Sequence, residues 1–465
     1  MADPLWTSDE IVRATGGMAS GGFSASGVSI DTRTLEPGDL FVALGGVRDG
    51  HEFVETALSK GAAGVLVSRD VAGPAVKVGD TLAALEQLGI AARQRAPQAR
   101  RGAVTGSVGK TSVTQAIIAG LKLAGPAHSS VKSYNNHIGV PLTLARMARD
   151  TQRAVFEIGM NHEGEIRPLT RMVRPHAALV TTVGPVHTEN FPDGELGVAR
   201  AKAEIFEGLD RGVAILNADN LWFDLLAAEA REAGAEVRTF GTGDGCDARL
   251  TDFQVQGPRA LVRARLHGRM LDIPILQTGL HWGLNSLAAL LMLEALEVDL
   301  DHSLAALAAF APLAGRGAES RVEARGGAFT LIDDSYNANP ISMASAIATL
   351  GARSTTGRRI VALTDMLELG PQAGPFHAGL AAPLEAASID LVFCAGPLMK
   401  SLWDALPATR RGGYAETAEA LSPRLAQAVE AGDVVMVKGS NGSKAGRIAQ
   451  ALLALGVPVT SGEAG

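Results

Sequence analysis

A short glycine-containing loop gives the clearest chemical signal in the sequence. The segment 105–112, TGSVGKTS, follows an expected strand and precedes a helical pattern. Backbone N–H groups of such a loop can bind phosphates, while the lysine reaches the β- and γ-phosphates and the next hydroxyl binds Mg²⁺. The full GxxxxGK[ST] pattern would have glycine in place of Val104, so the loop is a shortened variant. The sequence therefore predicts a site for a nucleoside triphosphate and Mg²⁺. Its expected residues are Thr105, Gly106, Ser107, Val108, Gly109, Lys110, Thr111 and Ser112.

Three further residues lie where a cation or a reacting group could be held. Glu157 ends the expected strand 153–159, and a carboxylate at the end of a parallel strand can bind a cation beside phosphates. His187 follows the next strand, and Lys202 belongs to a helical segment. Each also has an ordinary structural interpretation: a capping or exposed acid, a structural histidine and a solvated lysine. Taken singly, these residues are weak indications.

Amide-rich loops form a second group of candidate binding residues. Asn135 and Asn136 belong to the polar segment SYNNHIGVPLTL, which follows the helix after the glycine loop. Asn337 and Asn339 follow two aspartates at the end of an expected strand, in LIDDSYNANP. Acids and amides in that position can bind ribose hydroxyls or a polar substrate, although an Asx turn is the structural alternative.

The elements that must position these residues form three successive α/β units. Short strands and helices occupy 1–98, and a parallel βαβ rhythm runs through 99–314. Within it, 236–276 has strands without helices, and an antiparallel edge on the same sheet is one interpretation. The strand–helix pattern restarts in 315–465. We therefore expect three domains with these boundaries.

Composition excludes several classes of protein. The 465 residues are 46% hydrophobic, which is enough for several cores. A net charge of −7 and only 13 Phe, 4 Trp and 3 Tyr argue against nucleic-acid binding. The two cysteines, Cys246 and Cys394, have no metal-ligand spacing, and no apolar run approaches the length of a membrane span. We expect a cytoplasmic protein without a membrane span.

In their order along the chain, these segments resemble the Mur ligases of peptidoglycan precursor synthesis. The resemblance covers nearly the whole chain and includes DTRTLEPGDLFVALGG, TGSVGKTS, EIGMNHEGEI, HTENF, AKAEIFEGL and LIDDSYNANPISM. It implies a small α/β N-terminal domain for a nucleotide sugar and a central P-loop ATPase domain with a parallel sheet. A C-terminal Rossmann-like α/β domain would bring in the amino substrate.

The resemblance also implies roles for single residues. Glu157 and His187 would bind Mg²⁺ together with Thr111, and Lys202 would match a lysine that is carbamylated in several members. A carbamate is an anion that can hold a second Mg²⁺. The remaining implied contacts are Asn285 with adenine, Arg316 and Asp334 near phosphate and ribose, Asp31 and Arg33 with the uridine nucleotide, Asn135 and Asn136 with the nucleotide sugar, and Asn337, Asn339 and Lys438 with substrate.

Three departures from the family pattern accompany the resemblance. This chain has Thr181-Thr182 where the family often has TN, and His281-Trp282 where it often has HN. The last motif reads KGSNGSKAGRI, where a basic residue soon after KGS and a glutamate near 446 are expected. The last departure lies in the segment that holds Lys438, and none lies in the glycine loop.

The resemblance implies a specific reaction, the ATP- and Mg²⁺-dependent ligation of D-alanyl-D-alanine to UDP-N-acetylmuramoyl-tripeptide by a monomer. The segment DDSYNANP favours this reaction over that of the sibling ligase adding a single diamino acid, in which a DNPR-type segment is expected. Folylpolyglutamate synthases would lack the nucleotide-sugar domain ahead of the loop. A P-loop switch that binds ATP without a second substrate is the alternative from another class. Whether the third peptide residue is diaminopimelate or lysine stays open.

Overall fold

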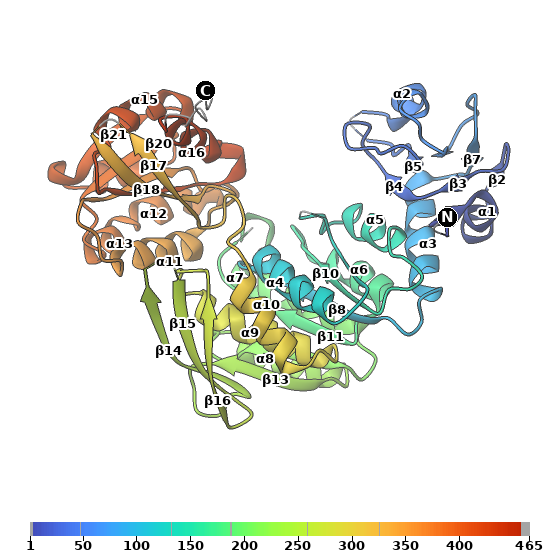
Figure 1. Ribbon diagram of the computed structural model, residues 1–465, viewed down its shortest axis with the longest axis horizontal. Helices are drawn as coiled ribbons and strands as arrows, with labels where there is room; N and C mark the ends of the chain where they lie inside the picture. Colours follow the sequence, from blue (N-terminus) through green and yellow to red (C-terminus); the bar gives the residue numbers. More distant parts are fainter. Residues whose placement is uncertain are drawn as a thin grey trace, which may run out of the picture.

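The computed structural model describes residues 3–46, 48–131, 133–186, 188–257, 259–324 and 326–456. Three multi-stranded sheets, each covered by helices, follow one another along these residues. The chain is therefore a three-domain α/β protein. Figure 1 shows the first and third domains at opposite ends of the long axis, with the central domain between and below them.

The N-terminal domain is built on a small five-stranded sheet with the order β2-β7-β6-β5-β4. Four of its strands are parallel and the edge strand β2 is antiparallel. The strands are β2 (Met18–Ala19), β4 (Gly27–Ser29), β5 (Asp39–Val42), β6 (Gly64–Val67) and β7 (Ala75–Lys77), beside the pair β1 (Trp6–Thr7) and β3 (Ser24–Ala25). The helices are α1 (Ser8–Thr15), η1 (Gly50–Phe53), α2 (Val54–Ser59) and α3 (Thr81–Gln94).

Aspartate side chains cap two of the helical segments in this domain. The segment after Asp49 begins as the 3₁₀ turn η1 and continues as α2. Asp49 explains this start, because its side chain accepts a hydrogen bond from the backbone N–H of His51 at 3.0 Å. The helix α3 is capped by Asp80, whose side chain accepts the N–H groups of Leu82 and Ala83.

The central domain has a nine-stranded sheet with the order β16-β15-β14-β13-β12-β11-β8-β10-β9. The pairs from β9 to β14 are parallel, and β15 and β16 continue the sheet as antiparallel strands. The strands without helices therefore form an antiparallel edge on the same sheet, as the sequence allowed. The strands are β8 (Arg100–Thr105), β9 (Ala127–Ser129), β10 (Arg153–Glu157), β11 (Ala177–Val180), β12 (Val213–Asn217), β13 (Glu236–Gly241), β14 (Ala248–Gln256), β15 (Arg259–Leu266) and β16 (Arg269–Ile275).

Helices cover both faces of this sheet and create two apolar cores. One core packs α4 (Lys110–Leu123), α9 (Trp282–Ala295) and α10 (Leu300–Ala309) on one face. The other face carries α5 (Gly139–Ala145), α6 (Ile166–Val173), α7 (Glu195–Ala203), η3 (Glu204–Gly208) and α8 (Phe223–Glu232). The short turn η2 (Thr188–Asn190) follows β11. The helix α9 is apolar on nearly all sides and is buried against β11 to β14, with α4 and α10 beside it.

The C-terminal domain has a six-stranded sheet with the order β17-β18-β22-β19-β20-β21, in which only β17 is antiparallel. Its strands are β17 (Ala318–Ala324), β18 (Gly327–Asp334), β19 (Arg359–Thr364), β20 (Leu391–Ala395), β21 (Arg411–Ala415) and β22 (Val434–Lys438). Its helices are α11 (Pro340–Gly351), η4 (Gly370–Gln372), α12 (Ala373–Ala378), α13 (Ala381–Ala386), α14 (Lys400–Ala405), η5 (Ala408–Arg410), α15 (Ala418–Ala428), η6 (Asn441–Ser443) and α16 (Ala445–Leu453).

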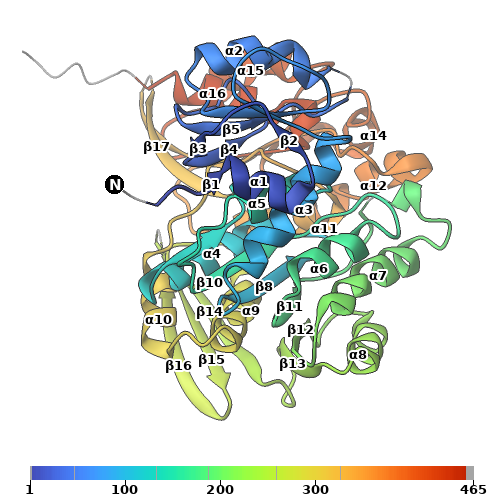
Figure 2. The same ribbon diagram turned by 90° about the vertical axis from the view of Figure 1, so that its right-hand side faces the viewer.

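Direct contacts join the central domain to both neighbours. On the N-terminal side, α3 packs on α5, and the indole Nε1 of Trp6 donates to the carbonyl of Ala145 at 2.8 Å. On the other side, the Thr278 hydroxyl donates to a carboxylate oxygen of Glu319 at 2.8 Å. Figure 2 shows the N-terminal domain above α5 and α6. Among the described residues, no helix is long and apolar enough to cross a membrane.

Candidate active site

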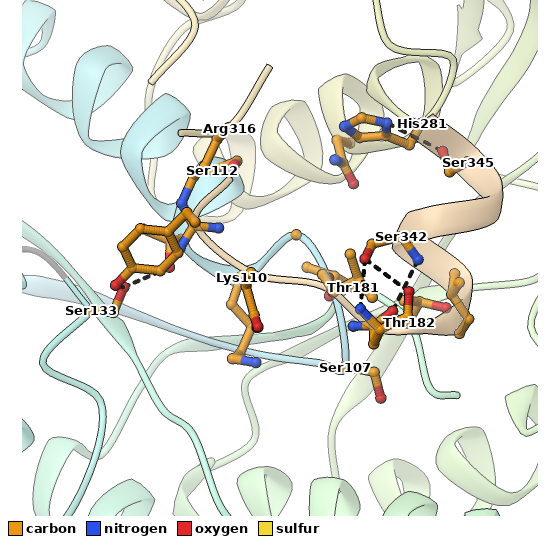
Figure 3. A pocket seen from close by; sticks show the side chains of 18 of the residues that line it. Ser107, Lys110, Ser112, Ser133, Thr181, Thr182, His281, Arg316, Ser342 and Ser345 are labelled. Atoms are coloured by element: carbon orange, nitrogen blue, oxygen red, sulfur yellow. Dashed lines mark hydrogen bonds between the residues drawn. The ribbon is translucent and has the colours of Figure 1, made fainter. Parts of the chain in front are cut away.

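A cavity of about 500 Å³ lies between the central and C-terminal domains. It is bounded by the loop after β8, the ends of β10, β11 and β22, the start of α9, and the segment that follows β18. Strand ends from two parallel sheets therefore meet at one cavity, which is where open α/β sheets bind ligands. Lys110, Ser133 and Arg316 enter it from three different segments (Figure 3).

The glycine loop has a backbone that only glycine can adopt without strain at two positions. Gly106 has φ +145° and Gly109 has φ +85°. A Cβ on Gly106 would lie 1.9 Å from Oγ1 of Thr181, so no side chain fits between the loop and the end of β11. The Thr181 hydroxyl itself donates to the Val108 carbonyl at 2.5 Å and so attaches the loop to the end of β11.

The helix that follows the loop presents an open N-terminus to the cavity. Gly109 is its N-cap and offers no side-chain hydrogen bond, so the first N–H groups of α4 are available to an anion. The Lys110 ammonium donates to the Gly106 carbonyl at 2.7 Å. Removal from water lowers the pKa of Lys110, whereas the nearby carboxylate of Glu157 opposes that shift. The loop, the helix terminus and the lysine together fit a polyphosphate.

Glu157 has a carboxylate that is half satisfied. The residue is 1% exposed; its Oε1 accepts a hydrogen bond from Nδ2 of Asn135 at 2.7 Å, whereas its buried Oε2 has no described partner. A buried carboxylate oxygen without a partner is costly unless a ligand completes it. A divalent cation is the ligand that such an oxygen prefers, so this carboxylate fits Mg²⁺ beside the phosphates. No group of three or more His, Cys, Asp or Glu side chains with metal-binding geometry occurs among the described residues, so hydroxyl or modified ligands would have to complete the site.

Lys202 is buried, not solvated. It lies near the end of α7 and is 3% exposed, and no acidic side chain in the described part of the chain forms an ion pair with it. Burial, reinforced by the positive charge of Lys110, lowers the pKa of Lys202 well below its ordinary value. The ordinary interpretation of a helical lysine as a solvated side chain is therefore wrong here.

The C-terminal domain contributes charged groups to the same cavity. Asp334 ends β18, and its Oδ2 accepts from the ammonium of Lys438, which ends β22, at 2.7 Å. The same ammonium donates to the Asn337 carbonyl at 3.0 Å. The guanidinium of Arg316 lies 4.1 Å from the centroid of the Tyr336 ring.

The asparagines have differing environments. Asn339 is 5% exposed and caps α11, its side chain accepting from the Ser342 N–H at 2.9 Å. Asn337 accepts the N–H of the next residue, Ala338, at 2.9 Å, whereas the Asx turn that was the structural alternative is formed by Asp333, whose side chain accepts the Ser335 N–H at 3.1 Å. Asn285 lies at the start of α9, beside Gly109 of the glycine loop. Asn339, Asn337 and Asn285 all line the cavity.

Most of the predicted site residues line this one cavity. They are Ser107, Val108, Gly109, Lys110, Thr111, Ser112, Asn135, Glu157, Asn285, Arg316, Asp334, Asn337, Asn339 and Lys438. Thr105 and Gly106, at the start of the loop, are buried and are not among the lining residues, and Asn136 precedes α5 and accepts the Gly139 N–H at 2.9 Å. Lys202 is buried and is not among the lining residues. His187 lies outside the described residues.

Asp31 and Arg33 lie apart from the cavity, in the N-terminal domain after β4. Their side chains pair with each other, with 2.6 Å between Nη2 of Arg33 and Oδ2 of Asp31. The arginine side chain is 86% exposed, so it is accessible to a ligand that binds this domain.

Several further residues line the cavity without having been predicted as site residues, and Ser133, Thr182, His281 and Tyr336 are among the polar ones. Ser133 and Tyr336 belong to the segments SYNNH and DDSYNANP, in which the predicted site residues are the asparagines and Asp334. Both residues lie in polar loops that follow predicted elements, and this position could have marked them as candidate site residues. Their mutual proximity was not predictable, because they belong to different domains.

Three family models match successive parts of the chain. The model described as Mur ligase family, catalytic domain, matches residues 24–100, and the Mur ligase middle domain matches residues 104–293. The Mur ligase, glutamate ligase domain, matches residues 320–441.

Similarity to single proteins extends over the full length. A Rickettsia prowazekii protein named UDP-N-acetylmuramoyl-tripeptide–D-alanyl-D-alanine ligase is 30% identical over 450 residues, covering 96% of this chain and 99% of that protein. An Escherichia coli protein of the same name is 35% identical over 452 residues, covering 91% of this chain and 93% of that protein. The crystal structure of MurF from Acinetobacter baumannii has a TM-score of 0.85 at 27% identity, covering 97% of this chain and 99% of that one. The chain therefore belongs to the Mur ligase family.

Proposed function

We propose that the protein is an ATP-dependent ligase that joins D-alanyl-D-alanine to UDP-N-acetylmuramoyl-tripeptide. The products are UDP-N-acetylmuramoyl-pentapeptide, ADP and phosphate. The observation that carries the proposal is full-length similarity to relatives named for this reaction. A cavity between a phosphate-binding loop and charged groups of a third domain is consistent with it.

The reaction proceeds in two steps. A carboxylate oxygen of the tripeptide attacks the γ-phosphorus of ATP, which forms an acyl phosphate and releases ADP. The amine of D-alanyl-D-alanine then attacks the acyl carbon and gives a tetrahedral intermediate. The intermediate expels phosphate, and the nitrogen loses a proton to leave the amide. Because two anions meet in the first step, positive charge must accumulate around the γ-phosphate.

The chain's own residues supply that positive charge and the orientation of the phosphates. We assign the triphosphate to the residues of the glycine loop, with Lys110 neutralising charge as the γ-phosphoryl group is transferred. When bound, Mg²⁺ would neutralise phosphate oxygens further, held by Thr111, Glu157 and His187 and, in a second position, by a carbamate on Lys202. The burial of Lys202 and the unpartnered oxygen of Glu157 support these assignments.

The remaining contacts belong to the same proposal. Asn285 would contact adenine, and Arg316 and Asp334 would contact phosphate and ribose. Substrate contacts are assigned to Asp31, Arg33, Asn135, Asn136, Asn337, Asn339 and Lys438. In this proposal residues 1–98 bind the nucleotide sugar, 99–314 bind ATP and 315–465 bring in the dipeptide. We place the reaction in the cytoplasm, where ATP is available, and expect a monomer.

Phosphate release tests the proposal. Wild-type protein is incubated with ATP, Mg²⁺ and UDP-N-acetylmuramoyl-tripeptide, with or without D-alanyl-D-alanine, and the product is identified by mass. We expect release to require both substrates and to yield the pentapeptide. Lys110→Met should lower the rate by about 10²–10³-fold or more, because it removes charge stabilisation in the transition state. The matched control Lys122→Met, at an exposed position of the same helix, should retain wild-type activity.

Two outcomes would contradict the assignment. Release driven by a single amino acid on the dipeptide precursor would identify the sibling ligase and would show that DDSYNANP is not diagnostic. ATP hydrolysis that is independent of any second substrate would favour a P-loop switch.

A further inference from the structure

Two hydroxyl–hydroxyl contacts connect the glycine loop with the C-terminal domain. The Oγ1 of Thr111 lies 3.1 Å from the Oγ of Ser133. The same Oγ of Ser133 lies 3.1 Å from the Oη of Tyr336. The three residues come from α4, from the loop before α5 and from the segment after β18. They form a continuous hydrogen-bonded chain across the boundary between two domains, which we call the hydroxyl chain.

The hydroxyl chain ends at Thr111, a residue that faces the nucleotide cavity. Thr111 lies in the first turn of α4, is 8% exposed and lines the cavity. A threonine hydroxyl has one proton and two lone pairs. If its proton is donated to Ser133, both lone pairs are free for a cation in the cavity. Ser133 can accept the hydrogen bond from Thr111 and donate its own proton to Tyr336. The hydroxyl chain can therefore keep the Thr111 hydroxyl in the orientation that leaves its lone pairs free.

Tyr336 is held firmly by its own domain. Its backbone N–H donates to the Gly315 carbonyl at 2.9 Å, and the Arg316 guanidinium lies 4.1 Å from its ring centroid. Gly315 has φ +70°, and a Cβ there would lie 3.1 Å from the Cβ of Tyr336. The position of the phenol oxygen is thus set by the C-terminal domain, although the residue is 38% exposed and contributes little to a core.

We propose that Tyr336 is a positioning residue that orients the hydroxyl of Thr111 through Ser133. The C-terminal domain would thereby complete the cation-binding geometry of the glycine loop. This inference rests on the proposed function only in taking Thr111 as a ligand of nucleotide-bound Mg²⁺. It assigns to Tyr336 and Ser133 a role in the nucleotide site that acts through another side chain.

Binding of a non-hydrolysable ATP analogue, measured by calorimetry with the full chain, tests the inference without relying on activity. Tyr336→Phe removes the hydroxyl but retains the ring under Arg316, and Ser133→Ala removes the middle of the hydroxyl chain. With saturating Mg²⁺, we expect each variant to bind the analogue roughly three- to tenfold more weakly, as expected for losing one hydrogen bond. With EDTA in place of Mg²⁺, both variants should bind the analogue as tightly as the wild type, because the hydroxyl chain acts through Thr111, the proposed ligand of Mg²⁺.

A double-mutant cycle separates this role from a general structural one. If the three hydroxyls act as a unit, the variant that combines Ser133→Ala with Tyr336→Phe should bind the analogue no more weakly than Ser133→Ala alone. Ser133→Thr, which retains the hydroxyl, should restore Mg²⁺-dependent binding. Tyr414→Phe is the matched control, since its hydroxyl bonds Glu416 at 3.1 Å and the residue does not line the cavity.

The possible results have distinct meanings. Additive losses, or equal weakening with EDTA, would overturn the inference in favour of ordinary packing. Wild-type binding by Tyr336→Phe with loss only in Tyr336→Ala would overturn it in favour of a contact through the aromatic ring. Failure of the wild type itself to bind the analogue with Mg²⁺ would contradict the proposed function instead.

Discussion

At the scale of single residues, the two carboxylates of Glu157 and Glu204 show how burial distinguishes a ligand from a structural group. Both residues are buried, at 1% and 4% exposure. The oxygens of Glu204 accept backbone N–H groups from Gly164 at 2.6 Å and Arg167 at 2.9 Å. In contrast, Oε2 of Glu157 faces no described donor. Glu204 is therefore satisfied within the fold, whereas Glu157 requires a ligand for full satisfaction.

Substitution by glutamine should separate these roles. Glu157→Gln retains the shape and removes an incompletely paired charge, so we expect its melting temperature to equal or exceed that of the wild type. Its ATP-dependent phosphate release should fall by about 10²-fold, because the carboxylate no longer attracts the cation. Glu204→Gln, the matched control, should lose roughly 1.5–3 kcal/mol of stability through weakened charge-assisted hydrogen bonds. Thermal unfolding and phosphate release of both variants check this, and a large stability loss in Glu157→Gln would contradict it.

At the scale of elements, a buried histidine fixes the segment that follows β19. His377 in α12 is fully buried, and its Nε2 accepts the N–H of Met366 at 2.9 Å. Its Nδ1 lies 2.6 Å from the Ala373 carbonyl, so this nitrogen carries the proton. These bonds require the neutral imidazole. Burial lowers the pKa of His377, while the Ala373 carbonyl and the charge of Asp365 oppose the shift.

Stability should consequently depend on pH through this residue. The unfolded chain has a histidine with an ordinary pKa of about 6.5, and the folded chain has a lower one. As the pH falls from 7 toward 5, His377 binds a proton in the unfolded state but remains neutral in the folded state. The free energy of unfolding therefore decreases. His377→Gln should show a smaller decrease than the wild type. Melting temperatures of the two proteins measured across this pH range check the prediction, and parallel curves for the wild type and His377→Gln would refute it.

At the scale of the whole molecule, one helix face joins the C-terminal domain to the central one. Ser345, Thr349 and Arg353 follow at intervals of four residues in and after α11, and all three contact the segment 278–281. Arg353 also forms an ion pair with Glu319, in which Nη2 lies 2.9 Å from Oε2. The Thr278 hydroxyl donates to the same carboxylate. This contact supports the boundary on which the cavity depends.

Loss of the arginine should weaken that boundary. In Arg353→Met the Glu319 carboxylate keeps its burial but loses its charged partner, so we expect a loss of roughly 2–3 kcal/mol. This is less than for a fully buried pair, because the two side chains are 12% and 22% exposed. Arg321→Met, from an exposed pair on β17, should have no measurable effect on thermal unfolding. Equal melting temperatures for both variants would show that the contact is dispensable.

The sequence by itself determined those features that depend on neighbouring residues. The strand, glycine loop and helix at 100–123 were predictable because backbone conformation and apolar periodicity are local properties. The strand that ends at Glu157 followed from the same signals, as did the order of three α/β units. The resemblance indicated the family and many of the cavity residues. The roles of single residues and the exact domain boundaries stay predictions.

Only the tertiary structure decided which distant groups meet. Lys202 is buried because of what packs around α7, and the unpartnered oxygen of Glu157 depends on Asn135 occupying the other oxygen. Ser133 and Tyr336 are 203 positions apart, and their contact requires two domains to dock. A residue's type and local spacing carry no information about the partner that a distant segment brings to it. Packing between elements sets that partner, and with it the charge and hydrogen bonding of the site.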